Sequence, residues 1–264
     1  MGDNLGTRAL PLRGGGSIPI VGFGTWQLEG DDAYRSTLDA LQVGYRHVDT
    51  ATGYGNEAQV GAALRDSGIA RSEVFVTTKC PPENAGREAE TIERSLELLG
   101  LEYVDLWLVH WPPNGDAAPA TWEQFVVARD AGRARFIGVS NYSIDQIDEI
   151  VAATGETPAV NQIRWSPNLY DPAVASALAE RGVVLEGYSP LRRSNLDDPV
   201  VAQLARTHGK TPAQVVLRWH VDKGFVVIPK SSHRERVEQN FALDDFELSA
   251  EEVQRLDGLA RLEG

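Results

Sequence analysis

Cysteine and long apolar runs are almost absent from this sequence. Cys80 is the single cysteine in 264 residues, so no disulfide can form within the chain, and we expect a reducing compartment, the cytoplasm. The first ten residues, MGDNLGTRAL, lack the apolar centre of a signal peptide. No run approaches the roughly 18 apolar residues that a membrane-spanning helix needs. We therefore expect no membrane association.

Positive charge is also scarce. The chain has 25 Lys and Arg against 38 Asp and Glu, which gives a formal net charge of -13 at pH 7. Proteins that bind nucleic acid usually carry a basic patch, so this composition disfavours a nucleic-acid partner. An anionic ligand would need a local cluster of positive side chains.

Short apolar runs alternate with longer amphipathic segments along the whole chain. Eight runs are predicted to be strands, at residues 20–24, 45–49, 74–79, 104–110, 136–139, 159–162, 183–187 and 225–228. Runs that are apolar on both faces are typical of buried parallel strands. Eight β/α alternations predict an α/β fold, a (β/α)8 TIM barrel that spans residues 1–264 as one domain. A doubly wound open sheet is the alternative.

Local sequence patterns predict an N-terminal hairpin and the starts of several helices. The turn-rich segment 13–17 predicts an N-terminal β-hairpin. Capping-box patterns predict the starts of three helices, at Ser143 with Gln146, Thr211 with Gln214, and Ser249 with Glu252. A cap residue followed by proline predicts a further helix start at Asp171-Pro172.

The common nucleotide-binding and metalloprotease motifs are missing. Gly22 begins a dinucleotide-like fingerprint, but Gln27 stands where its last glycine belongs. Gly209-Lys210-Thr211 ends like a P-loop, but Leu204 replaces its first glycine. No H-E-x-x-H and no pair of C-x-x-C motifs occurs. A bound dinucleotide would therefore be held without a Rossmann turn.

Polar side chains stand at consecutive predicted strand ends. Asp49 ends the second strand, Tyr54 follows in the next loop, Lys79 ends the third strand and His110 ends the fourth. Taken singly, an Asp is often a helix cap, a Lys a solvated side chain and a His a structural group. Together they lie at the carboxyl ends of barrel strands, where catalytic residues gather in this fold. We expect these four residues to form a catalytic group.

The sequence around these strand ends resembles the aldo-keto reductase family, from about residue 18 to residue 256. Its signatures occur in family order, as Asp49-Thr50-Ala51 with Tyr54-Gly55-Asn56-Glu57, Thr78-Lys79, Leu108-Val109-His110-Trp111-Pro112, Gly138-Val139-Ser140-Asn141, Asn161-Gln162, Tyr188-Ser189-Pro190-Leu191 and Ile228-Pro229-Lys230-Ser231. The chain is most similar to short bacterial members, and segment 209–230 resembles the 2,5-diketogluconate reductases.

The resemblance implies NADPH-dependent reduction of an aldehyde or ketone to an alcohol. Tyr54 would give the proton, and a free tyrosine has a pKa near 10. The Lys79 ammonium would lower that pKa, while Asp49 would hold Lys79 in place. His110 would donate a hydrogen bond to the substrate oxygen. The expected partner is a small carbonyl compound, and we expect the chain to act as a monomer.

The resemblance also implies which residues bind the cofactor. Ser140, Asn141 and Gln162 match the family's nicotinamide-carboxamide residues, Tyr188 the aromatic residue stacked on the nicotinamide, and Ser189 and Leu191 the pyrophosphate contacts. Lys230, Ser231, Ser232 and Arg236 match the group around the adenosine 2'-phosphate, and Asn240 an adenine contact. Gln239 stands where the family usually has Glu. A Lys and an Arg near a helix start suit a phosphate, which favours NADPH over NADH.

Tryptophans are the candidate walls of the substrate pocket. Trp26 and Trp111 are predicted to line it, with Trp165 as a weaker candidate, because large apolar walls suit a small carbonyl compound. Trp107 lies inside the fourth predicted strand and is assigned to the core. The loop after His110 is short, which predicts an open site and broad specificity.

Two other functions are compatible with the same residues. A non-enzymatic NADPH-binding sensor or regulatory subunit would keep the cofactor residues without turnover. A metal-dependent hydrolase could use His47 and Asp49, which share a strand face, together with His110. The remaining histidines fall on predicted helices, so we expect no metal site.

Overall fold

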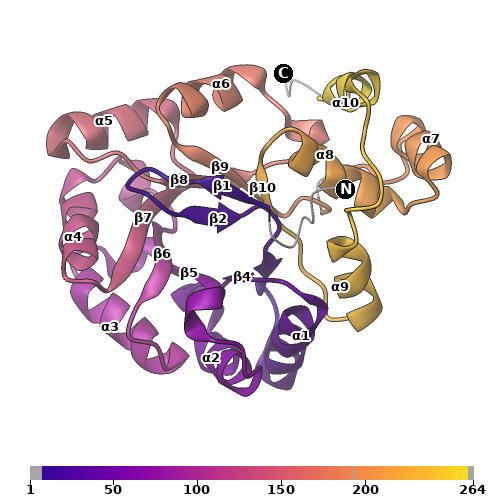
Figure 1. The fold of residues 1–264 in the computed structure, drawn as a ribbon. Helices are drawn as coiled ribbons and strands as arrows, with labels where there is room; N and C mark the ends of the chain where they lie inside the picture. Colours follow the sequence, from indigo (N-terminus) through magenta and orange to yellow (C-terminus); the bar gives the residue numbers. More distant parts are fainter. Residues whose placement is uncertain (1–7, 193, 261–264) are drawn as a thin grey trace.

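Eight parallel strands form the centre of the computed structural model, which describes residues 8–192 and 194–260 (Figure 1). Their order in the sheet is β10-β9-β8-β7-β6-β5-β4-β3. The strands are β3 (Phe23–Gly24), β4 (His47–Asp49), β5 (Phe75–Cys80), β6 (Val104–Val109), β7 (Ala134–Ser140), β8 (Val160–Arg164), β9 (Val184–Tyr188) and β10 (Val226–Ile228). A parallel bridge between Val21 and Val227 brings the two sheet edges together. The predicted (β/α)8 barrel is confirmed, and the open sheet is wrong.

All eight predicted strands occur, with small differences at their ends. β3 begins at Phe23, three residues later than predicted, and β7 begins at Ala134, two residues earlier than the predicted run. Arg135 interrupts the apolar run there. Its side chain is exposed and contacts Asp105, at 3.2 Å between Nη1 and Oδ1, so a charged residue continues the strand on its outer side.

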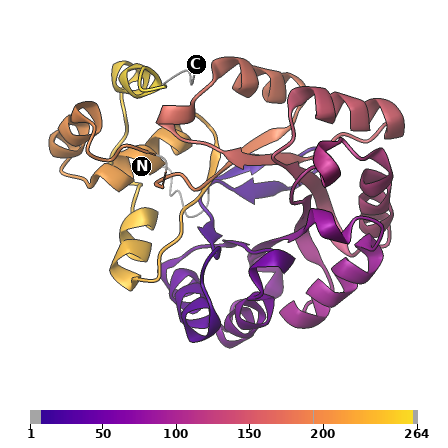
Figure 2. The ribbon, with the colours of Figure 1, turned by 180° about the vertical axis from the view of Figure 1, so that it is seen from behind.

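Helices surround the barrel, most of them between successive strands and the last two after β10 (Figures 1 and 2). They are α1 (Gly30–Val43), α2 (Glu57–Asp66), α3 (Glu88–Leu99), α4 (Pro119–Asp130), α5 (Ile144–Thr154), α6 (Pro172–Glu180), α7 (Pro199–His208), α8 (Pro212–Asp222), α9 (Arg234–Phe241) and α10 (Ala250–Asp257). Short 3-10 turns, η1 (Thr52–Tyr54) to η5 (Pro167–Leu169), lie in the connections. The capping boxes predicted at Ser143, Thr211 and Ser249 are all present.

The predicted N-terminal hairpin closes one end of the barrel. Its strands, β1 (Ala9–Pro11) and β2 (Ser17–Pro19), pair antiparallel. Leu12 and Ile18 are buried in one cluster with Phe75, Val160 and Val226, which begin or nearly begin their strands. The hairpin therefore covers the amino ends of the strands, and the carboxyl ends remain for a site.

The main apolar core lies between the barrel and the helices. Trp107, predicted to be a core residue, is fully buried and stacks on Phe125 from α4, with ring centroids 3.7 Å apart. Within residues 8–192 and 194–260, no helix combines the length and apolar character needed to cross a membrane.

Candidate active site

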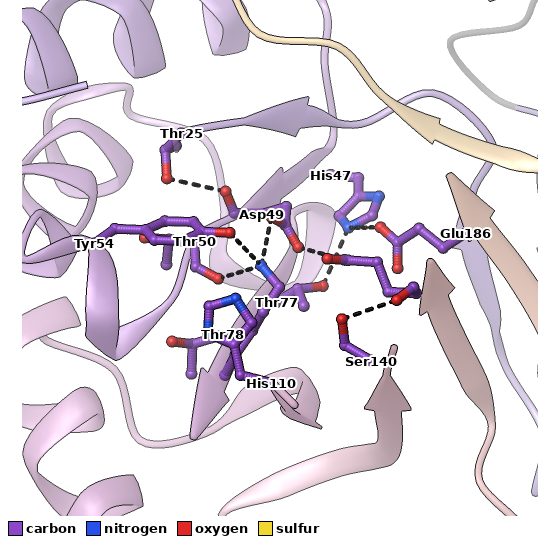
Figure 3. A network of polar contacts seen from close by, with 12 residues as sticks. Thr25, His47, Asp49, Thr50, Tyr54, Thr77, Thr78, His110, Ser140 and Glu186 are labelled. Carbon is purple, nitrogen blue, oxygen red and sulfur yellow. Dashed lines mark hydrogen bonds and ion pairs between the residues drawn. The ribbon is translucent and has the colours of Figure 1, made fainter. Parts of the chain in front are cut away.

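The four predicted catalytic side chains lie together at the carboxyl ends of adjacent strands, and Figure 3 labels Asp49, Tyr54 and His110 among them. Asp49 is the last residue of β4, Lys79 lies near the end of β5, and His110 directly follows β6. Tyr54 ends the 3-10 turn η1 that follows β4. Parallel strands bring these positions to one edge of the barrel, so the fold gathers residues that are up to 61 positions apart in the sequence.

Lys79 is the centre of this group. Its Nζ donates to Asp49 Oδ1 at 2.6 Å, to the Thr50 backbone carbonyl at 2.8 Å and to the Tyr54 hydroxyl at 3.4 Å. Lys79 is fully buried, and Asp49 is 2% exposed. A buried ammonium is tolerated only where charge and hydrogen bonds compensate it, and these three acceptors do so.

The pKa of Tyr54 has opposing causes. Burial of its hydroxyl raises the pKa, and the Lys79 ammonium lowers it through its charge and its hydrogen bond. Burial is the larger effect, so the net direction is upward. This is opposite to the direction expected from the sequence, although the predicted influence of Lys79 is present. At neutral pH the Tyr54 hydroxyl keeps its proton.

His110 is a neutral imidazole at neutral pH. Burial, followed by the charge of Lys79, lowers its pKa to about 3. Its ring lies edge-on to the Tyr54 ring, with centroids 5.6 Å apart. A neutral imidazole has one N–H to donate, so His110 can bind an oxygen that lies near the Tyr54 hydroxyl.

A second polar group adjoins the first through Gln162 and Asn141. Gln162 Nε2 donates to Asp49 Oδ2 at 2.8 Å, and its backbone carbonyl accepts from Ser140 Oγ at 2.8 Å. Asn141 Nδ2 donates to the His110 carbonyl at 3.1 Å, while its Oδ1 accepts from the Tyr188 hydroxyl at 2.8 Å. The four predicted nicotinamide residues are therefore assembled beside the catalytic group.

Two of the predicted cofactor residues have an unusual backbone conformation. Asn141 has φ of 63° and Ser189 has φ of 52°, in the left-handed region. Asparagine tolerates this region, but a serine there costs about 1–3 kcal/mol. Such conformations cluster at functional sites. Ser189 and the half-buried Leu191 lie in the turn after β9, at the same edge of the barrel.

The residues predicted to bind the 2'-phosphate lie in the loop after β10 and in the first turn of α9. Lys230 and Arg236 are exposed, and within the described residues neither has a carboxylate at ion-pair distance. Their neighbour Arg234, in contrast, contacts Asp39 and Glu238. Of the remaining predicted residues, Ser231 and Asn240 are buried, and Ser232 and Gln239 are exposed.

The comparisons with known proteins agree with this geometry. Residues 20–261 match the family model described as "Aldo/keto reductase family". An aldo-keto reductase of Mycolicibacterium smegmatis is 42% identical over 248 residues, which cover 92% of this chain and 90% of that protein. The chain belongs to the aldo/keto reductase family.

Solved structures extend this similarity to the fold. An aldo/keto reductase from Brucella melitensis superposes with a TM-score of 0.92 at 37% identity, covering 96% of this chain and 97% of that one. A Bombyx mori aldo-keto reductase, solved in complex with NADP, superposes with a TM-score of 0.89 at 32% identity, covering 96% and 92%. Family membership makes the chain an oxidoreductase that acts on carbonyl compounds.

The tryptophans of this aldo-keto reductase divide into two kinds. Trp26 and Trp111 are 41% and 45% exposed, as expected for pocket walls, and the Arg192 guanidinium lies 5.0 Å from the Trp26 ring centroid. Trp165 is only 3% exposed and packs edge-on against Tyr170 and Phe225. The weaker assignment of Trp165 to the pocket is therefore wrong, because it is a core residue.

His47, which the hydrolase alternative would need as a metal ligand, has other contacts. His47 Nε2 lies 3.1 Å from Thr77 Oγ1 and 3.7 Å from Glu186 Oε1. No group of three or more His, Cys, Asp or Glu in the described parts of the chain is arranged to hold a metal ion. The hydrolase alternative has no support from the geometry or the comparisons.

Sequence reasoning missed two features of the aldo-keto reductase site. The Thr50 backbone carbonyl is a third anchor of Lys79, which no side-chain motif reveals. Glu186 lies fully buried in β9, close to the catalytic group. The sequence does mark Glu186 as unusual, because an acidic residue inside an apolar run such as 183–187 is rarely buried without a partner.

Proposed function

We propose that this chain reduces small aldehydes and ketones to alcohols, using NADPH and Tyr54 as the general acid. The observation that carries the proposal is the position of the Lys79 ammonium, 2.6 Å from Asp49 Oδ1 and 3.4 Å from the Tyr54 hydroxyl. It stands at the mouth of a barrel that belongs to a family of carbonyl reductases. This arrangement suits a hydroxyl that must lose a proton and become an anion.

The proposed chemistry needs a proton at the substrate oxygen. Hydride addition to a carbonyl carbon places negative charge on the oxygen, and the Tyr54 hydroxyl would donate its proton there. The phenolate that remains would face the Lys79 ammonium, which stabilises it in a site of low dielectric constant. Asp49 keeps Lys79 in place through its 2.6 Å contact. His110, as a neutral donor, would orient the same oxygen.

The residues at the mouth of the barrel fit a nicotinamide cofactor, which when bound supplies the hydride. Gln162 Nε2 is occupied by Asp49, so its Oε1 would accept a hydrogen bond from the carboxamide. Ser140 and Asn141 would complete the carboxamide contacts, and Tyr188 would stack on the ring. Ser189 and Leu191 would contact the pyrophosphate through the backbone. The NADP complex of the Bombyx mori relative supports this assignment.

Positive charge at α9 supports NADPH rather than NADH. Lys230 and Arg236, which lack carboxylate partners within the described residues, would bind the 2'-phosphate with Ser231 and Ser232. Gln239 and Asn240 would lie at the adenine.

The remaining assignments concern the substrate and the state of the protein. Trp26 and Trp111 would form the apolar walls for a small carbonyl compound. We further propose that residues 1–264 act as one domain and as a monomer, in the cytoplasm.

A single substitution tests the central assignment. We expect Tyr54→Phe to lower kcat for NADPH-dependent reduction of a panel of small aldehydes and α-keto compounds by at least about 10²-fold. Loss of NADPH absorbance measures the rate, and quenching of tryptophan fluorescence checks that the variant still binds NADPH. Tyr34→Phe is the matched control, because Tyr34 is a surface tyrosine that donates to Asp66. A Tyr54→Phe variant with the wild-type rate would refute the role of Tyr54, and NADPH binding without any turnover would favour the sensor alternative.

A second pair of variants tests the cofactor assignment. Arg236→Ala should raise the KM for NADPH by roughly 10- to 100-fold and leave the KM for NADH nearly unchanged, because a charge-assisted hydrogen bond to phosphate contributes about 1.5–3 kcal/mol. Steady-state kinetics with both cofactors measure the difference. Arg234→Ala is the control on the same helix, because Arg234 contacts Asp39 and Glu238. Equal effects of the two substitutions would contradict the phosphate assignment.

A further inference from the structure

A second buried acid lies one layer below the catalytic group. Glu186 is in the middle of β9, is fully buried, and takes no part in the mechanism proposed above. Its Oε1 lies 3.7 Å from Nε2 of His47, on strand β4 across the barrel (Figure 3). Gln162, which contacts Asp49, is its direct neighbour in the β8–β9 register. Glu186 is thus connected to the catalytic group through the neighbouring strand β8 and through β4 on the opposite side of the barrel.

The charge of Glu186 would be only partly compensated, because Lys79 lowers its pKa less than burial raises it. Lys79 is held by Asp49 Oδ1 at 2.6 Å and by the Thr50 carbonyl at 2.8 Å. His47 is neutral, because burial, followed by the charge of Lys79, lowers its pKa to about 3. Within the described residues, neither Glu186 carboxyl oxygen has a hydrogen-bond partner within 3.5 Å, although the Gln162 side chain lies near enough to lower the pKa slightly against the effect of burial.

The charges of the cluster balance only if Glu186 is a neutral acid. Asp49 and Lys79 already cancel, so an ionised Glu186 would be an uncompensated charge in the barrel interior, which is very costly. Burial, followed by the charge of Asp49, raises the pKa of Glu186 to about 8. The titratable groups that face it are His47 and Asp49 from β4 and Lys79 from β5, with Tyr54 beyond Lys79.

We propose that Glu186 is a positioning residue that sets the alkaline limit of carbonyl reduction. As a neutral acid, it leaves the Lys79 ammonium to Asp49 and Tyr54. When Glu186 loses its proton to solvent, the new negative charge attracts Lys79 and disfavours the phenolate that Tyr54 becomes. Reduction then slows although Tyr54 is still protonated. This inference rests on the proposed role of Tyr54 as the acid.

The pH profile of Glu186→Gln tests this proposal, since Gln resembles the neutral acid and cannot ionise. We expect kcat within about twofold of wild type at about pH 6–7, with unchanged KM for NADPH and the carbonyl compound. Above about pH 8 the wild-type kcat should fall, and at about pH 9.5 the variant should be roughly tenfold faster, as expected when one charge is added in the barrel interior. Glu88→Gln is the control, since Glu88 is a buried acid on α3 that accepts from Thr121.

The outcomes separate this inference from the proposed function. Coincident wild-type and Glu186→Gln profiles would overturn the inference alone. So would a large loss of kcat at about pH 7 in folded Glu186→Gln, because the ionised carboxylate would then be required. Wild type that reduces no carbonyl compound would refute the proposed function itself.

A measurement on the wild-type protein keeps the inference testable without turnover and without the variant. Infrared spectroscopy of the cofactor-free protein should show a protonated carboxyl band at neutral pH. The band should disappear as the pH rises, over the range in which kcat falls. A band that is already absent at neutral pH, or one that persists while kcat falls, would overturn the inference.

Discussion

The carboxyl end of the barrel holds Asp49 and Lys79, and the layer beneath it holds His47 and Glu186. Both pairs are buried and each joins an acid to a base, with one member of each on β4. The upper pair is in close contact, with Nζ and Oδ1 2.6 Å apart, and it has further polar partners. The lower pair is 3.7 Å apart, and both oxygens of its acid lack hydrogen bonds within the described residues.

This difference shows what decides charge in a barrel interior. Close contact and additional hydrogen bonds let the upper pair stay ionised, since the Coulomb attraction then offsets the loss of hydration. The lower pair is not in close contact and its acid lacks hydrogen bonds within the described residues, so burial keeps the imidazole and the carboxylic acid neutral. The ionised pair is the one beside Tyr54, where a fixed positive charge is useful to an acid catalyst.

Removing the cation of the upper pair should have the largest effect. Lys79→Met leaves Asp49 buried without its counter-charge, which should cost about 3–5 kcal/mol of unfolding free energy. It also removes the charge that stabilises the Tyr54 phenolate, so kcat should fall by at least about 10²-fold. Urea denaturation and NADPH-dependent turnover measure the two effects. A folded Lys79→Met variant with unchanged turnover would contradict the comparison.

The catalytic residues of the upper layer could be predicted from their positions in the sequence. Asp49, Tyr54, Lys79 and His110 were predicted because parallel strands must bring their ends to one edge, whatever the packing details. The capping boxes at Ser143, Thr211 and Ser249 are equally local and were also predicted. Features that depend on one strand end or one helix start are therefore accessible from sequence.

Other features depend on distant parts of the chain and were not accessible. Trp165 follows a strand end like a pocket residue, but Tyr170 and Phe225 enclose it. The pKa of Tyr54 depends on how deeply its hydroxyl is buried, which outweighs the Lys79 charge. The state of Glu186 depends on His47 remaining neutral across the barrel. Burial and cross-barrel distances, which no motif encodes, decide all three.

The lower pair predicts a smaller effect, seen as a pH dependence of stability. Glu186 has a folded pKa of about 8 against an ordinary value of 4.5. Its contribution to the free energy of unfolding is therefore lost as the pH rises from about 4.5 to 8. His47 has a folded pKa of about 3 against 6.5, so its contribution is lost as the pH falls from about 6.5 to 3. Between about pH 4.5 and 6.5 the two slopes oppose each other and should nearly cancel.

Single substitutions should reveal separately how Glu186 and His47 make the stability depend on pH. Relative to wild type, Glu186→Gln should gain stability on the order of a few kcal/mol as the pH rises from about 4.5 to 8, since each pH unit corresponds to about 1.4 kcal/mol for one proton. His47→Gln should gain a similar amount as the pH falls from about 6.5 to 4. Urea denaturation across this range measures both. If the stability difference between Glu186→Gln and wild type stayed constant with pH, Glu186 would have the same pKa in the folded and unfolded chain. The two buried pairs would then not differ as described, because Glu186 would be ionised like Asp49.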